Sequence, residues 1–426
     1  MGPPNTKSTR NRSSPSAAAV IVGNDDLLIE LLLYLPTKAL IRFKSVSKRW
    51  FSLISSSHFC LLHTRRHRPT TAASALCLRK SPSDFYILPL FTKPSKMRSF
   101  KFNLTSDVIH ESIAAANPNF RTKILQSCNG LFLLKVPQNT RNLPGDYYVY
   151  NPATHQNRFL SLNFLPQNNS QSQRRQGILG INLAYDPSNS LDYKIICVYP
   201  DPCSLYVYQV AVYDSKIQSW KLGNGAKSFL MPYDVKFCDG VYWNGKIHWI
   251  REKGRKLYHF DVDKDSVGRS MRLPWEGRWR GDHVSDTYYF GNSNGHLHFI
   301  TMYLNQSSDS ELRIFEMEDD CSGWSLRYRV DFNDIVYAYP EMRRREVDLR
   351  YGDTNDSAIS VLGVVTGENG DSLLVFHVPG KVVAYKLKDK SFVDIVNLRR
   401  HHFSRKGLLK FGCYDAYEFI ETLAPV

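Results

Sequence analysis

The sequence predicts a multidomain α+β protein in which a small N-terminal unit of three helices is followed by a large all-β domain. One observation is an apolar pattern at helical spacing between Asn24 and Phe59. Another is a change of character near Ser74, after which short β-branched and aromatic runs alternate with turn residues. The length of 426 residues also exceeds what one hydrophobic core usually organises.

The first helix is expected to begin after Asn24, because an asparagine side chain accepts hydrogen bonds from the free N–H groups at a helix start. Asp25 and Asp26 then lie near the positive end of the helix dipole, where acidic residues are stabilising. Pro36 should end this helix, because the residue before a proline is pushed out of the α region. The apolar residues that recur at helical spacing are Leu27, Leu28, Leu31, Leu32 and Leu35.

Two further helices are expected before Phe59. Thr37 is predicted to cap the second and Ser47 the third. Leu33 and Trp50 do not fit a single inward-facing stripe, so part of the apolar surface is expected to face a partner. The alternative is that the helices form only a small cap on the adjoining domain. The apolar residues of these two helices are Leu40, Ile41, Phe43, Val46, Trp50, Leu53 and Ile54.

The segment LPTKALIRFKSVSKRWFSLI resembles the F-box, the adaptor-docking module of SCF-type ubiquitin ligases. The matching residues are Leu28, Pro36, Leu40, Phe43, Val46, Ser47, Arg49, Trp50 and Phe59. The resemblance implies a Skp-type adaptor as a partner and, through it, a cullin and a RING subunit. It also implies that the adaptor is contacted by Leu28, Pro36, Leu40, Val46 and Trp50. The family usually opens with Leu-Pro, where this chain has Gly23-Asn24.

The chain is expected to divide into four parts. Residues 1–20 are rich in Ser, Pro, Ala and Arg, which predicts a disordered tail. Residues 21–63 form the helical module, and the basic residues 64–73 form a linker. Residues 74–426 form the β domain.

The β domain contains a repeat. Asn-Gly pairs, which favour two-residue hairpin turns, occur in the segments 128–134, 242–250, 293–300 and 368–376. A strand, a turn and a second strand follow each pair, with a loose period of about fifty residues, the size of a propeller blade. The predicted blades are 74–103, 124–162, 178–222, 236–275, 288–332 and 359–400, and the segment Tyr417–Leu423 is expected to close the first. A β-sandwich with irregular hairpins is the alternative.

With these repeats, the second domain is similar to the kelch-like, F-box-associated β-propeller domain of plant F-box proteins. The resemblance implies that the protein is the substrate-recognition subunit of an SCF-type ubiquitin ligase, with a target protein held by the propeller. Such a subunit is not an enzyme. The alternatives are a propeller that binds nucleic acid and a propeller that processes a small molecule or a glycan.

The charge distribution argues against nucleic acid as a partner. The net charge is +15, yet residues 1–70 hold 11 Lys and Arg against 3 Asp and Glu, which leaves 44 against 37 in the rest. The large domain is therefore only mildly basic. The 8 cysteines form no C-x-x-C pair, and no apolar run reaches the ~18 residues of a membrane span. We expect reduced thiols in an intracellular protein, in the cytoplasm or the nucleus.

No catalytic residue, cofactor or metal site is expected. The chain lacks G-x-S-x-G, P-loop and H-E-x-x-H motifs. The histidine pairs His63–His67 and His296–His298 have no Cys or carboxylate nearby at ligand spacing. Two basic groups in predicted loops are expected to bind an acidic or phosphorylated target, because arginine forks suit phosphate. They are Arg343, Arg344 and Arg345, and Arg278 and Arg280; an ordinary solvated charge run is the alternative.

Overall fold

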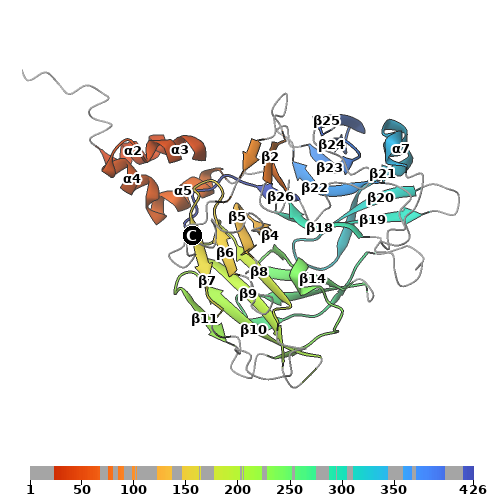
Figure 1. The fold of residues 1–426 in the computed structure, drawn as a ribbon, viewed down its shortest axis with the longest axis horizontal. Helices are drawn as coiled ribbons and strands as arrows, with labels where there is room; N and C mark the ends of the chain where they lie inside the picture. The colour runs from red at the N-terminus through yellow and green to blue at the C-terminus, as the bar shows by residue number, and fades with distance from the viewer. Residues whose placement is uncertain are drawn as a thin grey trace, which may run out of the picture.

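The structure is a computed structural model in which four N-terminal helices lie beside a ring of six antiparallel sheets (Figure 1). This arrangement confirms the predicted helical module followed by a six-blade propeller. None of the helices in the described part of the chain is long and apolar enough to cross a membrane. The described residues are 24–67, 75–79, 85–90, 98–100, 102, 122–136, 146–162, 164, 177–201, 204, 206–222, 228–251, 255–274, 287–293, 295–304, 310–343, 358–366, 371–398 and 416–426.

The helical module consists of α2 (Asp25–Leu32), α3 (Thr37–Phe43), α4 (Lys48–Ser55) and α5 (Ser57–His67). Two predicted caps are confirmed. The Asn24 side chain accepts a hydrogen bond from the backbone N–H of Asp26 at 2.9 Å. The Ser47 hydroxyl accepts one from the backbone N–H of Trp50 at 3.2 Å.

The predicted cap at Thr37 is wrong. Pro36 occupies the cap position of α3 and makes no side-chain hydrogen bond there, while Thr37 is the first residue of the helix. The Thr37 hydroxyl instead donates to the backbone carbonyl of Glu421, at 3.3 Å. The Thr37 hydroxyl, which the local sequence predicts to cap the helix, therefore makes a tertiary hydrogen bond instead.

The fourth helix, α5, was not expected from the sequence. It begins after Ser56, whose hydroxyl accepts from the backbone N–H of Phe59 at 3.2 Å, and it continues through Thr64–His67, residues expected to belong to a linker. Its apolar residues show little helical periodicity. Tertiary contacts hold its end, because His63 Nε2 lies 2.9 Å from the carbonyl of Leu35.

Each blade is one antiparallel sheet, and the predicted blade ranges match these sheets to within a residue except that β12 of blade 3 lies beyond residue 222 and β26 of blade 1 comes from the C-terminal segment. Blade 1 contains β26 (Ala416–Phe419), β1 (Ala75–Arg79), β2 (Phe85–Pro89) and β3 (Arg98–Phe100). Blade 2 contains β4 (Lys123–Cys128), β5 (Leu131–Val136), β6 (Asp146–Tyr150) and β7 (Asn157–Leu160). Blade 3 contains β8 (Gly180–Tyr185), β9 (Tyr193–Pro200), β10 (Val207–Asp214), β11 (Ser219–Leu222) and β12 (Phe229–Leu230).

The other three blades have the same plan. Blade 4 contains β13 (Val241–Trp243), β14 (Lys246–Arg251), β15 (Lys256–Asp261), β16 (Ser266–Val267) and β17 (Met271–Arg272). Blade 5 contains β18 (Thr287–Ser293), β19 (His296–Leu304), β20 (Ser310–Met317) and β21 (Trp324–Asp331). Blade 6 contains β22 (Ser360–Thr366), β23 (Ser372–Val378), β24 (Lys381–Lys386) and β25 (Ser391–Asn397). Within the described residues, the β domain also contains the short helices η2 (Phe237–Asp239), α7 (Phe332–Ala338) and η3 (Pro340–Met342).

Two of the four Asn-Gly turns lie wholly within the described residues, and both behave as the sequence predicts. Asn129 and Gly130 have φ values of 47° and 94°, and Asn244 and Gly245 have 47° and 71°. A two-residue hairpin of this type needs positive φ at both central positions, which asparagine and glycine tolerate best. These turns join the first two strands of blades 2 and 4.

The ring closes through the C-terminal segment. Strand β26 pairs antiparallel with β1, with Ala75 opposite Phe419 and Leu78 opposite Ala416. The predicted closure of blade 1 by this segment is confirmed, although the paired part ends at Phe419. Closure removes the exposed sheet edge that β1 would otherwise present.

After β26 the chain crosses to the helical module. Leu423 is 2% exposed and packs in the apolar cluster that contains Leu28, Leu40 and Phe59. The Asn151 side-chain amide donates to the carbonyl of Thr422 at 3.1 Å. We call residues 420–426 the C-terminal tail. It connects the helices to blade 2 as well as to blade 1.

Candidate functional site

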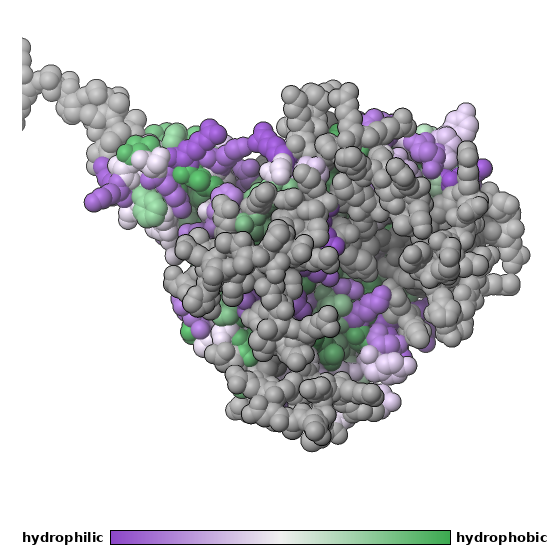
Figure 2. Space-filling model, viewed as in Figure 1, coloured by the Kyte–Doolittle hydropathy of each residue, from purple (hydrophilic) through white to green (hydrophobic). Residues whose placement is uncertain are grey.

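The helical module carries large apolar side chains on its outer surface, visible at the upper left of Figure 2. Leu27, Leu31 and Tyr34 are 44%, 52% and 65% exposed. Leu27 and Leu31, four residues apart, lie on one side of α2, and Tyr34 follows in the turn after this helix. Val46 and Phe51, before and within α4, are 59% and 56% exposed. We call these five residues the module's apolar surface.

The structure divides the five residues that the resemblance assigns to adaptor contact. Leu28 and Leu40 are 2% and 0% exposed and lie in the core of the module, so they support its surface and do not form it. Val46 is on the apolar surface. Pro36 is exposed, whereas Trp50 is half-buried, and its ring packs edge-on against Phe43 at a centroid distance of 5.5 Å. Direct contact with an adaptor stays a prediction for each of them.

The sequence pattern did not single out Leu27, Leu31, Tyr34 or Phe51 as surface residues. The available signal was that α2 is apolar on more than one side, since leucine occupies neighbouring positions along it. Periodicity alone does not say which side faces the core. The position of α5 and of Leu423 decides it, because both pack against the other side of the module.

Of the predicted basic groups, only Arg343 belongs to the described residues. It is exposed and follows η3, where its backbone N–H donates to the carbonyl of Pro340 at 3.2 Å. This part of the chain is attached to blade 6 through Tyr339, whose hydroxyl donates to Asp394 at 2.9 Å. The other four arginines, Arg344, Arg345, Arg278 and Arg280, lie outside the described residues.

The first histidine pair has a structural role at the end of α2. His63 Nε2 and His67 Nε2 lie 2.9 and 2.8 Å from the carbonyls of Leu35 and Leu33. Burial lowers the pKa of His63 to about 4, so this ring is neutral near pH 7. Within the described residues, no group of three or more His, Cys, Asp or Glu side chains is arranged to hold a metal ion.

The second histidine pair has a carboxylate neighbour that sequence spacing did not reveal. The register of blade 5 sets Glu316 opposite His298, and Glu316 Oε1 lies 2.9 Å from His296 Nδ1. Arg327 Nε lies 3.4 Å from the other oxygen of Glu316. The carboxylate is therefore shared with an arginine, as in a surface ion-pair network.

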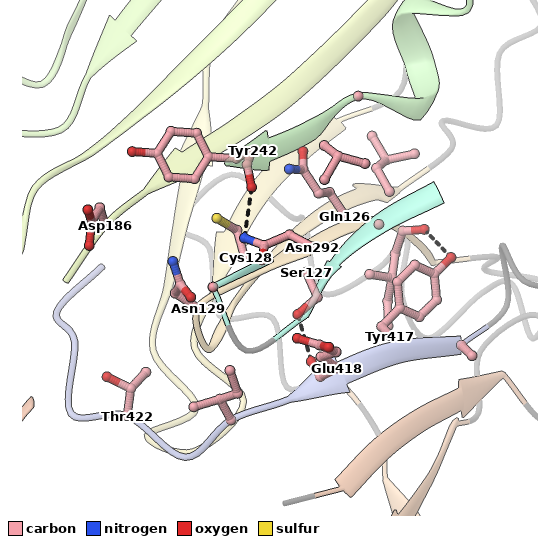
Figure 3. Close-up of a pocket in the computed structure, with 18 of the residues that line it drawn as sticks. Gln126, Ser127, Cys128, Asn129, Asp186, Tyr242, Asn292, Tyr417, Glu418 and Thr422 are labelled. Atoms are coloured by element: carbon pink, nitrogen blue, oxygen red, sulfur yellow. Dashed lines mark hydrogen bonds between the residues drawn. The ribbon is translucent and has the colours of Figure 1, made fainter. Parts of the chain in front are cut away.

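A cavity of about 380 Å³ occupies the axis of the propeller. Its walls come from the innermost strands β4, β13, β18 and β26 (Figure 3), together with Leu362 of β22. His63, Thr64 and His67 of α5 line it at the end near the helical module. Lys123, at the start of β4, lines the opposite end and is exposed. The cavity thus runs through the part of the ring where several blades meet.

Polar side chains line this axis because each innermost strand has one edge without a neighbouring strand, and its backbone groups need other partners. The Ser127 hydroxyl donates to the carbonyl of Glu418 at 2.6 Å. The Tyr417 hydroxyl donates to the carbonyl of Ile124 at 2.7 Å. These bonds connect blades 1 and 2 along the axis.

Glu418 is one of the acidic residues in the cavity wall. Its neighbours Tyr417 and Phe419 pack in the cluster shared with blade 2, so strand alternation turns Glu418 to the opposite side. There the hydroxyl of Ser293, on β18 of blade 5, hydrogen-bonds to its carboxyl group. Burial raises the pKa of Glu418 to about 7. Its Oε1 atom is buried and has no hydrogen-bond partner.

Comparison with known proteins bears on both domains. Residues 88–320 match the family described as the F-box associated beta propeller domain, and residues 24–62 match the F-box domain. F-box protein At5g07610 of Arabidopsis thaliana is 29% identical, with 100% of this chain and 97% of the relative covered. F-box protein At5g49610 of the same plant is 26% identical over 71% of this chain and 77% of the relative.

A kelch-type relative and a solved structure are more distant. The putative F-box/kelch-repeat protein At1g12870 of Arabidopsis thaliana is 28% identical over 54% of this chain and 52% of the relative. The solved structure of the GH43 protein BlXynB from Bacillus licheniformis has a TM-score of 0.31 and 10% identity, covering 65% of this chain and 54% of that one. A TM-score this low supports no inference about fold or function.

Proposed function

Since the chain belongs to the family of proteins with an F-box-associated β-propeller domain, we propose that it is the substrate-recognition subunit of an SCF-type ubiquitin ligase. The helical module docks a Skp-type adaptor, through which a cullin and a RING subunit are reached. The propeller holds the target protein. The subunit performs no chemistry itself, and it acts by raising the effective concentration of target lysines near the activated ubiquitin.

The observation that carries this proposal is the module's apolar surface. Leu27, Leu31, Tyr34, Val46 and Phe51 are all more than two-fifths exposed in a module that matches the F-box domain. Fully burying one aliphatic or aromatic side chain stabilises a complex by roughly 1.5–3 kcal/mol. A partner that covers these residues therefore gains enough to bind tightly.

The C-terminal tail supports the same proposal. Leu423 lies in the core of the module, while the carbonyls of Thr422 and Ala424 accept hydrogen bonds from Asn151 of blade 2, at 3.1 and 2.8 Å. The tail holds the module against the propeller. A fixed geometry of this kind suits a receptor that must present its target to a catalytic site elsewhere in the complex.

The decisive experiment measures binding of a purified Skp-type adaptor by isothermal titration calorimetry. Leu31→Lys places a charge on the apolar surface and should weaken binding by at least ~30-fold, the effect of losing about 2 kcal/mol. Ile217→Lys, on blade 3, is the matched control, because Ile217 is 51% exposed and Leu31 is 52% exposed. It should leave the affinity unchanged.

Absence of adaptor binding by the wild-type protein would contradict the proposal. The Gly23-Asn24 pair, where the family usually has Leu-Pro, would then be the first position to examine. Equal loss of affinity in Leu31→Lys and Ile217→Lys would show that the apolar surface is not the docking site.

The basic groups remain a proposal for the target side. Replacing Arg343, Arg344 and Arg345 together by serine should reduce recovery of an acidic or phosphorylated target, because guanidinium forks bind phosphate in two-point fashion. Adaptor binding should not change in this variant. Unchanged target recovery at moderate salt would assign these arginines to ordinary surface.

A further inference from the structure

The axial cavity has the size of a ligand site. Its volume of about 380 Å³ falls within the roughly 300–1,000 Å³ typical of small-molecule pockets. The cavity is lined by the innermost strands of five different blades and is part of the ring itself, so its walls are held by the closed propeller. Nothing in the proposed adaptor docking uses it.

Two hydrogen-bond acceptors in the wall have no partner. Glu418 Oε1 and Asn292 Oδ1 are both buried and unpaired. The other end of the Asn292 amide is fixed, because its Nδ2 donates to the carbonyl of Tyr242 at 3.0 Å (Figure 3). The Oδ1 atom of Asn292 is therefore the atom that can accept a hydrogen bond from a ligand. A buried polar atom without a partner is costly, and a ligand that donates hydrogen bonds removes this cost.

The charges around the cavity favour a cation. Its lining contains the carboxylates of Asp186, Asp239, Glu418 and Glu421 against one lysine, Lys123. His63 adds no charge near pH 7, because burial lowers its pKa to about 4. This acidic lining lies in a chain whose net charge is +15. The local excess of carboxylates is thus opposite to the charge of the whole protein.

A metal ion does not fit this arrangement. The described residues contain no group of three or more potential ligands at metal-binding positions. One carboxylate oxygen and one amide oxygen, from β26 and β18, instead suit a group that carries several N–H donors.

We propose that the axial cavity binds an organic cation, an alkylguanidinium or alkylammonium group, whose N–H groups pair with Glu418 and Asn292. The charge-assisted bond to Glu418 is the main source of affinity. Binding also stabilises the ionised form of Glu418, whose pKa of about 7 in the empty cavity is set by burial. The cation therefore displaces a proton when it binds below or near pH 7.

Two sources can supply this group. One is a free small molecule. The other is an arginine or lysine side chain of a target protein, inserted at the end of the cavity marked by the exposed residues Lys123 and Cys238. The second source rests on the proposed function, whereas the first does not.

The test measures the binding of two cationic probes to the full chain by isothermal titration calorimetry. No adaptor is present. Agmatine represents the free cation. An N-acetylated, C-amidated Gly-Arg-Gly peptide represents a target side chain, and the same peptide with citrulline removes the charge at constant shape. We expect saturable 1:1 binding of at least one cationic probe and at least about tenfold weaker binding of the citrulline peptide.

Glu418→Gln is the matching protein variant, because glutamine keeps the shape and can still accept from Ser293. This variant should weaken binding of the cationic probe by at least about tenfold. Glu311→Gln is the control, since Glu311 lies on β20 outside the cavity lining. Thermal melting of both variants establishes that the ring is intact. If Glu418→Gln does not fold, Glu418→Asp serves instead, because it draws the carboxylate back by one methylene group, and it should also weaken binding of the cation.

The outcomes separate the possibilities. Binding of agmatine alone assigns the cavity to a free molecule, and binding of the arginine peptide assigns it to a target side chain. Failure of both cations to bind, or equal affinity for arginine and citrulline peptides, overturns the proposal. Because no adaptor is present, neither result depends on the ubiquitin-ligase assignment.

Discussion

The hydroxyl of Thr37 donates a hydrogen bond to the backbone carbonyl of Glu421 at 3.3 Å, although 384 residues of sequence separate them. The contact brings the start of α3 onto the C-terminal tail. Leu423, two residues further on, is buried among the leucines of the helical module. The same short segment therefore closes the propeller ring and completes the core of the other domain.

The role of Leu423 can be tested by truncating its side chain. Leu423→Ala should destabilise the helical module by about 2–4 kcal/mol, the usual cost of removing a buried leucine. Hydrogen exchange followed by mass spectrometry should show faster exchange in α2 to α5 and little change in blades 3 to 5. Leu230→Ala is the control, because Leu230 is 76% exposed. If the helices of the module exchange equally slowly in both variants, Leu423 packs against the module without stabilising it.

Deleting residues 416–426 should abolish soluble expression. The deletion removes β26, leaves an edge of β1 unpaired and opens the ring, and an open edge of this kind promotes aggregation. Deleting only Pro425 and Val426 keeps β26 and Leu423 and should be tolerated. Size-exclusion chromatography distinguishes the two products. A longer deletion that stays monomeric and melts within a few degrees of the wild type would show that closure is not needed.

Phe51 and Trp50 should respond differently to truncation. Phe51 is 56% exposed, so Phe51→Ala should weaken adaptor binding by about tenfold or more with little loss of stability. Trp50 is half-buried against Phe43, so Trp50→Ala should weaken binding by at least ~30-fold and also destabilise the module. Calorimetry with the adaptor and melting of the module measure the two effects. Destabilisation by Trp50→Ala with unchanged affinity would make Trp50 a core residue only.

Glu418 gives the stability of the protein a defined pH dependence. Burial raises its pKa to about 7, from an ordinary value of 4.5. The folded protein thus holds this proton more tightly than the unfolded chain, so the stabilisation is complete below about pH 4.5 and is lost as the pH rises to about 7. The change is on the order of 3 kcal/mol. The variant Glu418→Gln has no titrating group at this position and should lack this pH-dependent change in stability.

The measurement is the difference in melting temperature, variant minus wild type, at several pH values. We expect this difference to rise between pH 5 and pH 7.5. The buried histidines act in the opposite direction, because burial lowers the pKa of His63, His248 and His298 to about 4, 3 and 4. These histidines are present in both proteins, so their contributions to the pH dependence cancel in the difference between the two melting temperatures. A difference that does not vary with pH would mean that Glu418 titrates normally.

The sequence by itself determined most of the local elements and their order, with α5 as the exception. The cap at Asn24 and the Asn129-Gly130 turn each follow from the residue's own backbone preferences or short-range hydrogen bonds. The stop predicted at Pro36 was only approximate, because the first helix already ends at Leu32. The blade repeat was readable because each hairpin carries its own turn signal. Even the closing segment could be found, because a ring with a short first blade needs one more strand.

Only the tertiary structure decided which residues face outward and which meet across the ring. Leu28 and Leu31 have the same chemistry and lie on one helix, yet one is 2% and the other 52% exposed, because α5 and Leu423 cover only one side of it. Glu418 and Ser293 lie on different blades, and no periodic pattern relates them. Their contact exists because closure of the ring brings the innermost strands around one axis, a long-range condition that no local signal encodes.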